Sequence, residues 1–212
     1  MENKNYNPLD QLSDIRQLME RSSRFISLSG LSGVFAGIYA IIGAGAAYWY
    51  LRINISSRVR YDYIIENGGI KIDFLAFFIL DAGSVLLLAL LTGIYLTTKA
   101  AKKNKQSIWD KTAQKLLINM AIPLITGGVF CLAILTHHLY GLIAPAMLLF
   151  YGLALVNASK YTHGDVRQLG ICEIVLGLLS SFFIGYGLLF WTIGFGVLHI
   201  IYGIVMYYKY EK

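Results

Sequence analysis

The sequence is short of charged residues. Charged side chains make up 14% of the 212 residues, whereas about a quarter is usual in a soluble domain. Hydrophobic side chains make up 57%, and they gather in long runs. This composition excludes an ordinary soluble domain. It predicts an all-α membrane protein, because runs of this length can cross a bilayer as helices.

The sequence also lacks the motifs of enzymes and metal sites. It has no HExxH, GxSxG or Walker-type phosphate-binding motif. Its two cysteines, Cys131 and Cys172, form neither a CxxC pair nor a metal-binding spacing. His137 and His138 are adjacent in a short turn, and no third ligand accompanies them in sequence. We therefore expect no enzymatic activity, no cofactor and no metal site.

Six apolar segments are typical of membrane-crossing helices. Two of them come from one run between residues 169 and 208, which is too long for a single crossing and has a turn signal at Gly185, Tyr186 and Gly187. The segments predict a bundle of six transmembrane helices over residues 25–208, with a short tail at 209–212. The predicted spans are residues 25–51, 74–98, 116–135, 141–156, 169–184 and 188–208.

The first 24 residues form a polar leader. Leu9, Leu12, Ile15 and Leu18 recur in it at helical spacing, with charged residues on the other faces. This pattern predicts an amphipathic helix on the cytoplasmic face of the bundle. Such a helix either lies on the membrane surface or binds a cytoplasmic protein, and the sequence leaves both readings open.

The basic residues predict the orientation. With the N-terminus in the cytoplasm, 14 of the 18 Lys and Arg residues fall on that side: 4 in the leader, 6 in Lys99–Lys115, 2 in residues 157–168 and 2 at the C-terminus. Cytoplasmic loops carry such an excess. We therefore expect both termini in the cytoplasm and the protein in the plasma (inner) membrane. The positions of these residues in short loops favour anionic lipid over nucleic acid as the partner of Lys99–Lys115.

The first span contains a small-residue motif. Gly33 and Gly37 form a GxxxG pair, and such pairs let helix backbones approach closely. The motif predicts close packing, either against another helix of the same chain or against a second copy in a homo-oligomer.

The second span contains an acid, Asp81, within about 25 nearly unbroken apolar residues. An acid at mid-membrane costs about 2.5–3.5 kcal/mol on insertion scales, so it needs a partner or a purpose. We expect Asp81 either to coordinate an ion or proton or to form a structural hydrogen bond as a neutral carboxyl. We expect the face of the third span that carries Asn119, Thr126 and His137 to be its neighbour. The polar stripe around Asp81 is Phe77, Asp81, Ser84, Leu88, Thr92, Tyr95 and Lys99.

Two more ionisable residues lie within predicted spans. Glu173 shares a face of the fifth span with small residues, and His199 shares a small-residue face of the sixth. The two spans are consecutive and antiparallel, so we expect these faces to meet. A Glu173–His199 pair would either lock the bundle or form part of a proton or solute path.

Two functional hypotheses follow. The first is a small transporter or channel for an ion, a proton or a small solute, with a polar site around Asp81. Its candidate path residues are Asp81, Ser84, Thr92, Asn119, Glu173 and His199. The second is a non-transporting accessory or sensor subunit that binds a cytoplasmic partner through the leader and the lysine-rich loop.

Overall fold

The computed structural model describes residues 29–54, 72–103, 107 and 109–212. The predicted leader helix and most of the loop at 52–73 lie outside these residues. In the described part, the regular structure is helical. The helices are α2 (Gly30–Asn54), α4 (Ile72–Lys103), α5 (Lys111–Thr136), α6 (Ile143–Ala158), α7 (Asp165–Phe182), α8 (Gly187–Trp191) and α9 (His199–Tyr210).

The chain is a membrane protein with transmembrane helices. Five of the described helical segments are long and apolar enough to cross a bilayer: Gly30–Leu51, Leu75–Lys103, Lys111–Thr136, Tyr140–Tyr161 and Gly187–Tyr210. Helix α7 is 18 residues long but is not among them. It carries Asp165, Arg167 and Glu173, and these three charges lower its apolar character.

The last membrane segment is one rod made of three parts. Helix α8 continues into a π-helix, η3 (Thr192–Leu198), which continues into α9. The predicted turn before this rod is present: α7 ends at Phe182, and Gly185 adopts a φ of +106°. A positive φ is accessible to glycine at no steric cost, so the chain reverses here.

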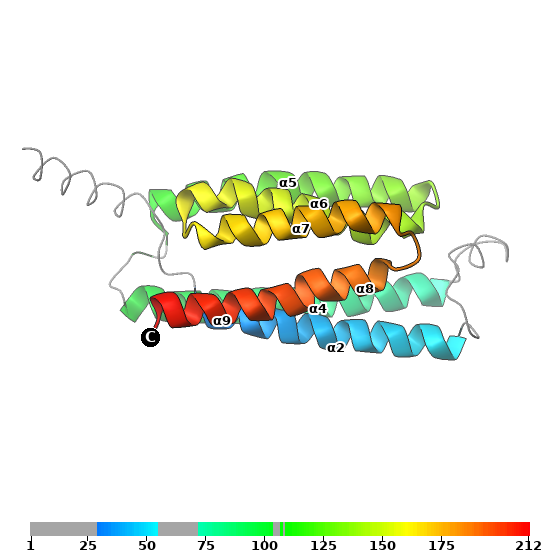
Figure 1. Ribbon diagram of the computed structural model, residues 1–212, viewed down its shortest axis with the longest axis horizontal. Coiled ribbons are helices and arrows are strands. Elements are labelled where there is room, and N and C mark those ends of the chain that lie inside the picture. Colours follow the sequence, from blue (N-terminus) through cyan, green and yellow to red (C-terminus); the bar gives the residue numbers. More distant parts are fainter. Residues whose placement is uncertain (1–28, 55–71, 104–106, 108) are drawn as a thin grey trace, which may run out of the picture.

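The helices form two layers of three (Figure 1). In one layer α6 packs between α5 and α7, and in the other α2 packs between α4 and the α8–α9 rod. We call the first the middle layer, because α5, α6 and α7 come from the middle of the sequence. We call the second the outer-chain layer, because it combines the first two described helices with the last. The layers touch where α6 and α7 meet the rod of α8, η3 and α9. We call this contact the seam.

Glycines set the closest contacts within each layer. A Cβ atom added at Gly37 would lie 2.6 Å from the backbone oxygen of Gly196, and one at Gly33 would lie 3.3 Å from the Cα atom of Gly203. The GxxxG pair therefore packs against η3 and α9 of the same chain. This contact within the chain uses the same face of α2 that a second copy would need in order to form a homo-oligomer. A homo-oligomer through Gly33 and Gly37 stays a prediction without support from this packing.

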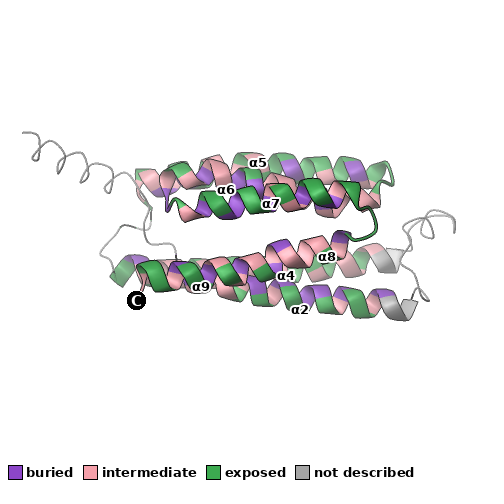
Figure 2. Cartoon of the chain, viewed as in Figure 1, coloured by how far each residue is buried: buried purple, intermediate pink, exposed green. Residues whose placement is uncertain are grey.

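Most helices expose apolar side chains at the outer surface of the bundle (Figure 2). Helix α4 is the most open, since none of its apolar window is buried. Its contacts are chiefly with α2. An apolar surface of this kind suits lipid as the solvent, because acyl chains bury it.

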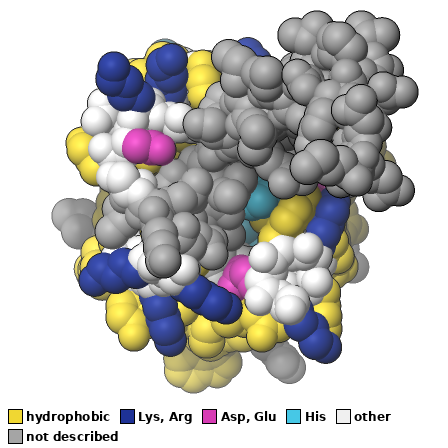
Figure 3. Space-filling model, turned by 90° about the vertical axis from the view of Figure 1, so that its left-hand side faces the viewer, with side chains coloured by type: hydrophobic (Ala, Val, Ile, Leu, Met, Phe, Trp, Pro, Cys, Tyr) yellow, Lys and Arg dark blue, Asp and Glu magenta, His cyan; other side chains and the backbone are white. Residues whose placement is uncertain are grey.

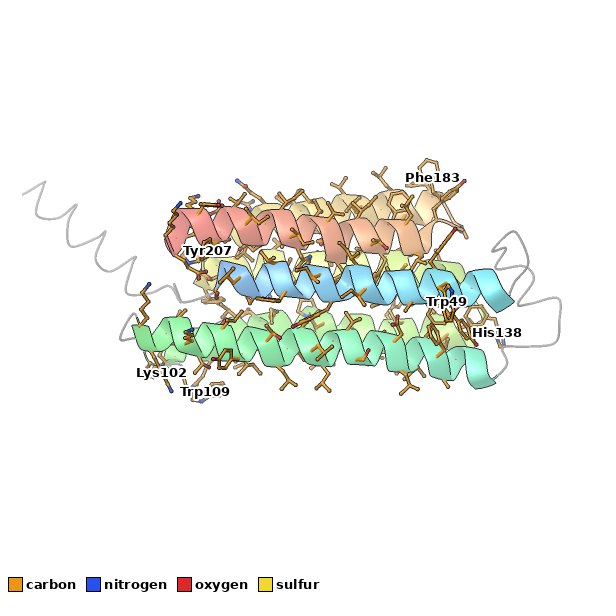
Figure 4. All side chains as sticks on the ribbon, turned by 90° about the horizontal axis from the view of Figure 1, so that it is seen from below. Trp49, Lys102, Trp109, His138, Phe183 and Tyr207 are labelled. Atoms are coloured by element: carbon orange, nitrogen blue, oxygen red, sulfur yellow. The ribbon has the colours of Figure 1, made fainter. Side chains whose placement is uncertain are left out.

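The two ends of the bundle differ in chemistry. We call one the basic end: Lys102, Trp109 and Tyr207 lie there, and Lys and Arg side chains surround it (Figures 3 and 4). Trp49, His138 and Phe183 lie at the other, the hairpin end (Figure 4). Tryptophan and tyrosine at both ends are typical of the two membrane interfaces.

The basic end also carries polar contacts between the layers. The Lys209 ammonium group donates to both carboxylate oxygens of Asp165, at 3.0 and 2.8 Å, and the Tyr210 hydroxyl donates to Asp165 at 2.7 Å. Glu211 accepts hydrogen bonds from the Ser29 hydroxyl and the Gly30 backbone N–H at the start of α2. The C-terminus of α9 thus joins α2 of its own layer to α7 of the other.

We expect the stability of the protein to fall more steeply in acid than that of the Asp165→Asn variant. Hydrogen bonds from Lys209 and Tyr210 hold the pKa of Asp165 below its ordinary value. A lowered folded pKa gives stability that is complete above the unfolded value of about 3.9 and is lost as the pH falls through the folded value. The contact is solvated, so at most about 1 kcal/mol is at stake. Thermal unfolding in detergent between pH 7 and pH 3 measures it.

Lys209→Met is the matched control, because it removes the partner rather than the titrating group. It should flatten the acid limb in part, because Tyr210 still donates to Asp165. Equal acid sensitivity in wild type and both variants would contradict the contact.

Candidate functional site

Three polar side chains meet at the seam, and two of them, Glu173 and His199, are buried. Glu173 of α7 and Tyr151 of α6 come from the middle layer, and His199, the first residue of α9, comes from the other. Glu173 is eight residues from the start of α7 and His199 is eleven residues from the end of α9. At 1.5 Å per residue both lie roughly 12–17 Å from the basic end, near the middle of a bilayer.

Glu173 has no exposed surface, and neither carboxyl oxygen has a hydrogen-bond partner. Its Oε1 lies 3.5 Å from Nδ1 of His199. A Cβ atom added at Gly194 would lie 2.5 Å from its Oε2. The missing side chain at Gly194 is therefore what gives the carboxyl group its space. The expected contact between Glu173 and His199 is present.

The histidine ring is fixed by bonds at both nitrogens. Nδ1 lies 3.0 Å from the backbone oxygen of Gly194, and Nε2 lies 2.7 Å from the Tyr151 hydroxyl. A carbonyl oxygen only accepts, so Nδ1 must carry a proton. In the neutral ring Nε2 then accepts from the Tyr151 hydroxyl. The Glu173 carboxyl therefore lies next to Nδ1, whose proton is already donated to the backbone oxygen of Gly194.

The π-helix lies directly before His199. The ring nitrogen Nδ1 of His199 bonds to the backbone oxygen of Gly194, five residues earlier, whereas the His199 backbone N–H bonds to Gly196. Gly194 and Gly196 are both buried in this segment, one against Glu173 and the other against α2. The Phe195 ring, at 4.9 Å from Tyr151 and 5.9 Å from His199 between centroids, packs beside both. Such π segments often occur at functional sites.

The arrangement can hold and exchange a proton. Burying a carboxylate costs several kcal/mol unless a partner neutralises it. At this site a proton on Glu173 or an imidazolium at His199 would do so. Both arrangements contain the same number of protons. Because Nδ1 already carries a proton, the imidazolium forms by protonation at Nε2, on the side of Tyr151, and the Glu173 carboxylate, 3.5 Å from Nδ1, then balances its charge.

Asp81 lies elsewhere, at the contact of α4 with α2. A Cβ atom added at Gly43 would be 3.4 Å from Asp81 Oδ1. The carboxyl group is half-buried, and it has no hydrogen-bond partner among the described residues. The expectation that the third span is its neighbour is wrong, because α4 packs on α2 while α5 packs on α6.

The polar stripe of α4 faces only partly inward. Thr92 bonds to the Tyr39 hydroxyl of α2 at 3.1 Å, and Phe77 stacks on Tyr50 at 4.0 Å. Ser84 is exposed, and its hydroxyl donates to the backbone oxygen of Asp81. The face of α4 turned to α2 is thus rotated from the one that the sequence suggested. Leu88, Tyr95 and Lys99 lie exposed beyond its edge.

Asn119 belongs to a third polar contact, between α5 and α6. Its backbone oxygen accepts a hydrogen bond from the side-chain amide of Asn157 at 2.8 Å. The structure therefore separates the six path candidates into three places. Glu173 and His199 meet at the seam, Asp81, Ser84 and Thr92 lie along α4, and Asn119 lies on the α5–α6 contact.

Sequence reasoning missed Tyr151, Gly194 and Asn157. Tyr151 and Gly194 sit inside apolar runs, where a tyrosine or a glycine reads as ordinary packing. Asn157 stands at the end of an apolar run, where the polar residues 157–168 begin, and nothing there indicates a contact. Asn157 lies near Pro123 and Asn119 because α5 packs against α6. No local sequence pattern predicts that pairing. Within the described residues, no three His, Cys, Asp or Glu side chains lie together as metal ligands do.

Comparison with known proteins gives one family. A protein-family model described as TMEM128 protein matches residues 31–162. The match includes Asp81, Asn119 and Tyr151 and ends before Glu173. No curated protein and no solved structure matches the chain.

Proposed function

This chain belongs to the TMEM128 family and is a membrane protein, and from this premise we propose that it is a small transporter or channel for an ion, a proton or a small solute. The proposal includes no enzymatic step. It gives the central place to Glu173 and His199 and treats Asp81 as a second intramembrane acid.

One observation carries the proposal. Glu173 is fully buried with neither carboxyl oxygen hydrogen-bonded, at the contact between two layers of helices. A carboxyl that served only to lock the bundle would be expected to have its hydrogen bonds made, because an unsatisfied buried group costs about 1–3 kcal/mol. An intramembrane ionisable group is a functional candidate by default. Its place between two layers supports a site that opens when they move apart.

The proposal includes the topology. We propose six membrane crossings, which are the five long apolar segments and α7. The charged residues of α7 include Glu173, which belongs to the proposed transport site. We also propose that the basic end faces the cytoplasm of the plasma (inner) membrane, since Lys and Arg gather in cytoplasmic loops. The start of α2, the end of α4, the start of α5 and the end of α9 are all at that end (Figure 1), which agrees with an even number of crossings.

The test is a solute screen on reconstituted liposomes. Charge movement on a solid-supported membrane would be recorded for protons, sodium, potassium, chloride and a panel of small metabolites. A pH-sensitive dye and radiolabelled solutes would report electroneutral movement. We expect at least one solute to move faster than in protein-free liposomes. Silence in all three readouts would contradict transport and favour the accessory or sensor role.

The Asp81→Asn variant belongs in the same screen. A lower flux in this variant would put the α2–α4 contact on the path, as the sequence suggested. Wild-type flux would confine the path to the seam.

A further inference from the structure

Proline at position 123 frees a backbone oxygen in α5. Pro123 has no N–H, so it cannot donate to the backbone oxygen of Asn119, four residues earlier. That oxygen instead accepts from the Asn157 side chain of α6 at 2.8 Å. Within a membrane such a freed group has to be satisfied by protein. The proline therefore ties α5 to α6 at one particular depth.

An open groove begins beside this contact, between α5 and α6. Its volume is about 380 Å³. Pro123 and Thr126 of α5 and Phe150 and Leu153 of α6 line its apolar length, and Asn157 and Lys160 line its polar end. Since α5 and α6 are both long and apolar enough to cross the bilayer, the groove opens toward lipid.

The polar end has an unneutralised positive charge. Lys160 is exposed and follows α6 in a short turn at the basic end. Its ammonium group lies 3.5 Å from the side-chain oxygen of Asn157, and no carboxylate pairs with it among the described residues. Lys160 stands at the depth of the lipid headgroups, because it lies just past the last residue of a membrane-crossing helix.

The groove has the layout of a phospholipid. From Lys160 to Phe150 is ten residues, or about 15 Å along a helix, comparable to much of the length of an acyl chain. We propose that this groove binds one anionic membrane phospholipid, with the phosphate at Lys160 and an acyl chain along Leu153 and Phe150. The site is separate from the seam, and it stands whether or not the protein transports a solute.

The test is retention of lipid by the purified full chain in native mass spectrometry. Phosphatidylglycerol and phosphatidylcholine with identical acyl chains would be added in equal amounts. We expect wild type to retain phosphatidylglycerol preferentially. Lys160→Gln should reduce this preference about fivefold, the equivalent of the roughly 1 kcal/mol that one basic residue contributes near an anionic surface.

Two further variants make the result specific. Lys212→Gln removes an exposed lysine at the same end and should leave the preference unchanged. Leu153→Trp fills the apolar length of the groove and should reduce retention of both lipids. Equal retention of both lipids by wild type, or an unchanged preference in Lys160→Gln, would overturn the proposal.

Discussion

Replacing Gly203 with alanine is expected to destabilise the protein strongly. A Cβ atom at this position would lie 2.5 Å from the backbone nitrogen of Val34 and 2.6 Å from the backbone oxygen of Gly30. Both are backbone atoms, so α2 itself must move away from α9. Overpacking of this kind costs about 1–3 kcal/mol, and close approach at small residues is a main source of helix association in membranes.

The matched control is Gly93→Ala in α4, where an added Cβ atom meets nothing within 4 Å. Alanine favours a helix over glycine by up to about 1 kcal/mol, so this variant should be as stable as wild type or slightly more so. Thermal unfolding in detergent, followed by tryptophan fluorescence, compares the two. Equal midpoints for Gly203→Ala and Gly93→Ala would show that α2 and α9 do not pack as described.

The apolar runs predicted the helices well. Each of the six predicted segments contains a helix, and the turn at Gly185 separates the last two. Such runs are recognisable because a bilayer requires long, internally hydrogen-bonded helices. The count of six crossings stays a prediction, since α7 carries three charges that weaken its apolar signal.

Helix ends were less predictable than helix centres. Ser107, followed three residues later by Asp110, fits a capping box, and this pattern predicts a helix start near Trp109. The structure begins α5 at Lys111, and Asp110 is the cap, accepting from the Ala113 backbone N–H at 2.6 Å. Both residues are good caps, and which one serves depends on how the preceding chain enters the helix.

The pairing of helices could be predicted only in part. Glu173 and His199 lie on consecutive helices joined by a tight turn, so their meeting followed from local order. Asp81 lies on a helix whose next neighbour in sequence, α5, is in the other layer. Layer membership depends on which small-residue faces fit one another, as Gly37 fits Gly196. That fit is a property of pairs of helices and leaves no signal in either helix alone.

The π-helix at Thr192–Leu198 had no sequence signal either. Its glycines are common in membrane helices, and only the structure shows that Gly194 packs against Glu173 of one layer and Gly196 against Ile41 of the other. The hydrogen bond between Tyr151 and His199 depends on the same register. The sequence therefore indicated the site through Glu173 and His199, and only the structure identified Tyr151 and Gly194 beside them.

Glu173→Gln is expected to abolish flux while leaving the fold intact. Glutamine has nearly the same shape as a protonated glutamic acid, so the space beside Gly194 stays filled. It cannot gain or lose a proton, and it cannot neutralise an imidazolium at His199. The thermal midpoint of this variant should therefore stay close to that of wild type, which separates loss of function from loss of structure.

Asp165→Asn is the matched control for removing an acid. Asp165 lies on the same helix, but at the basic end and away from the seam. This variant should keep its flux near neutral pH, because its contact with Lys209 is solvated and contributes little.

The most direct measurement is the initial flux of the solute identified in the screen, at equal amounts of incorporated protein. Wild type, Glu173→Gln and Asp165→Asn would be measured side by side in the same liposomes. Flux through Glu173→Gln at the level of protein-free liposomes, with wild-type flux through Asp165→Asn, is the expected result. Wild-type flux through Glu173→Gln would contradict a transport site at the seam. It would show that Glu173 has only a structural role.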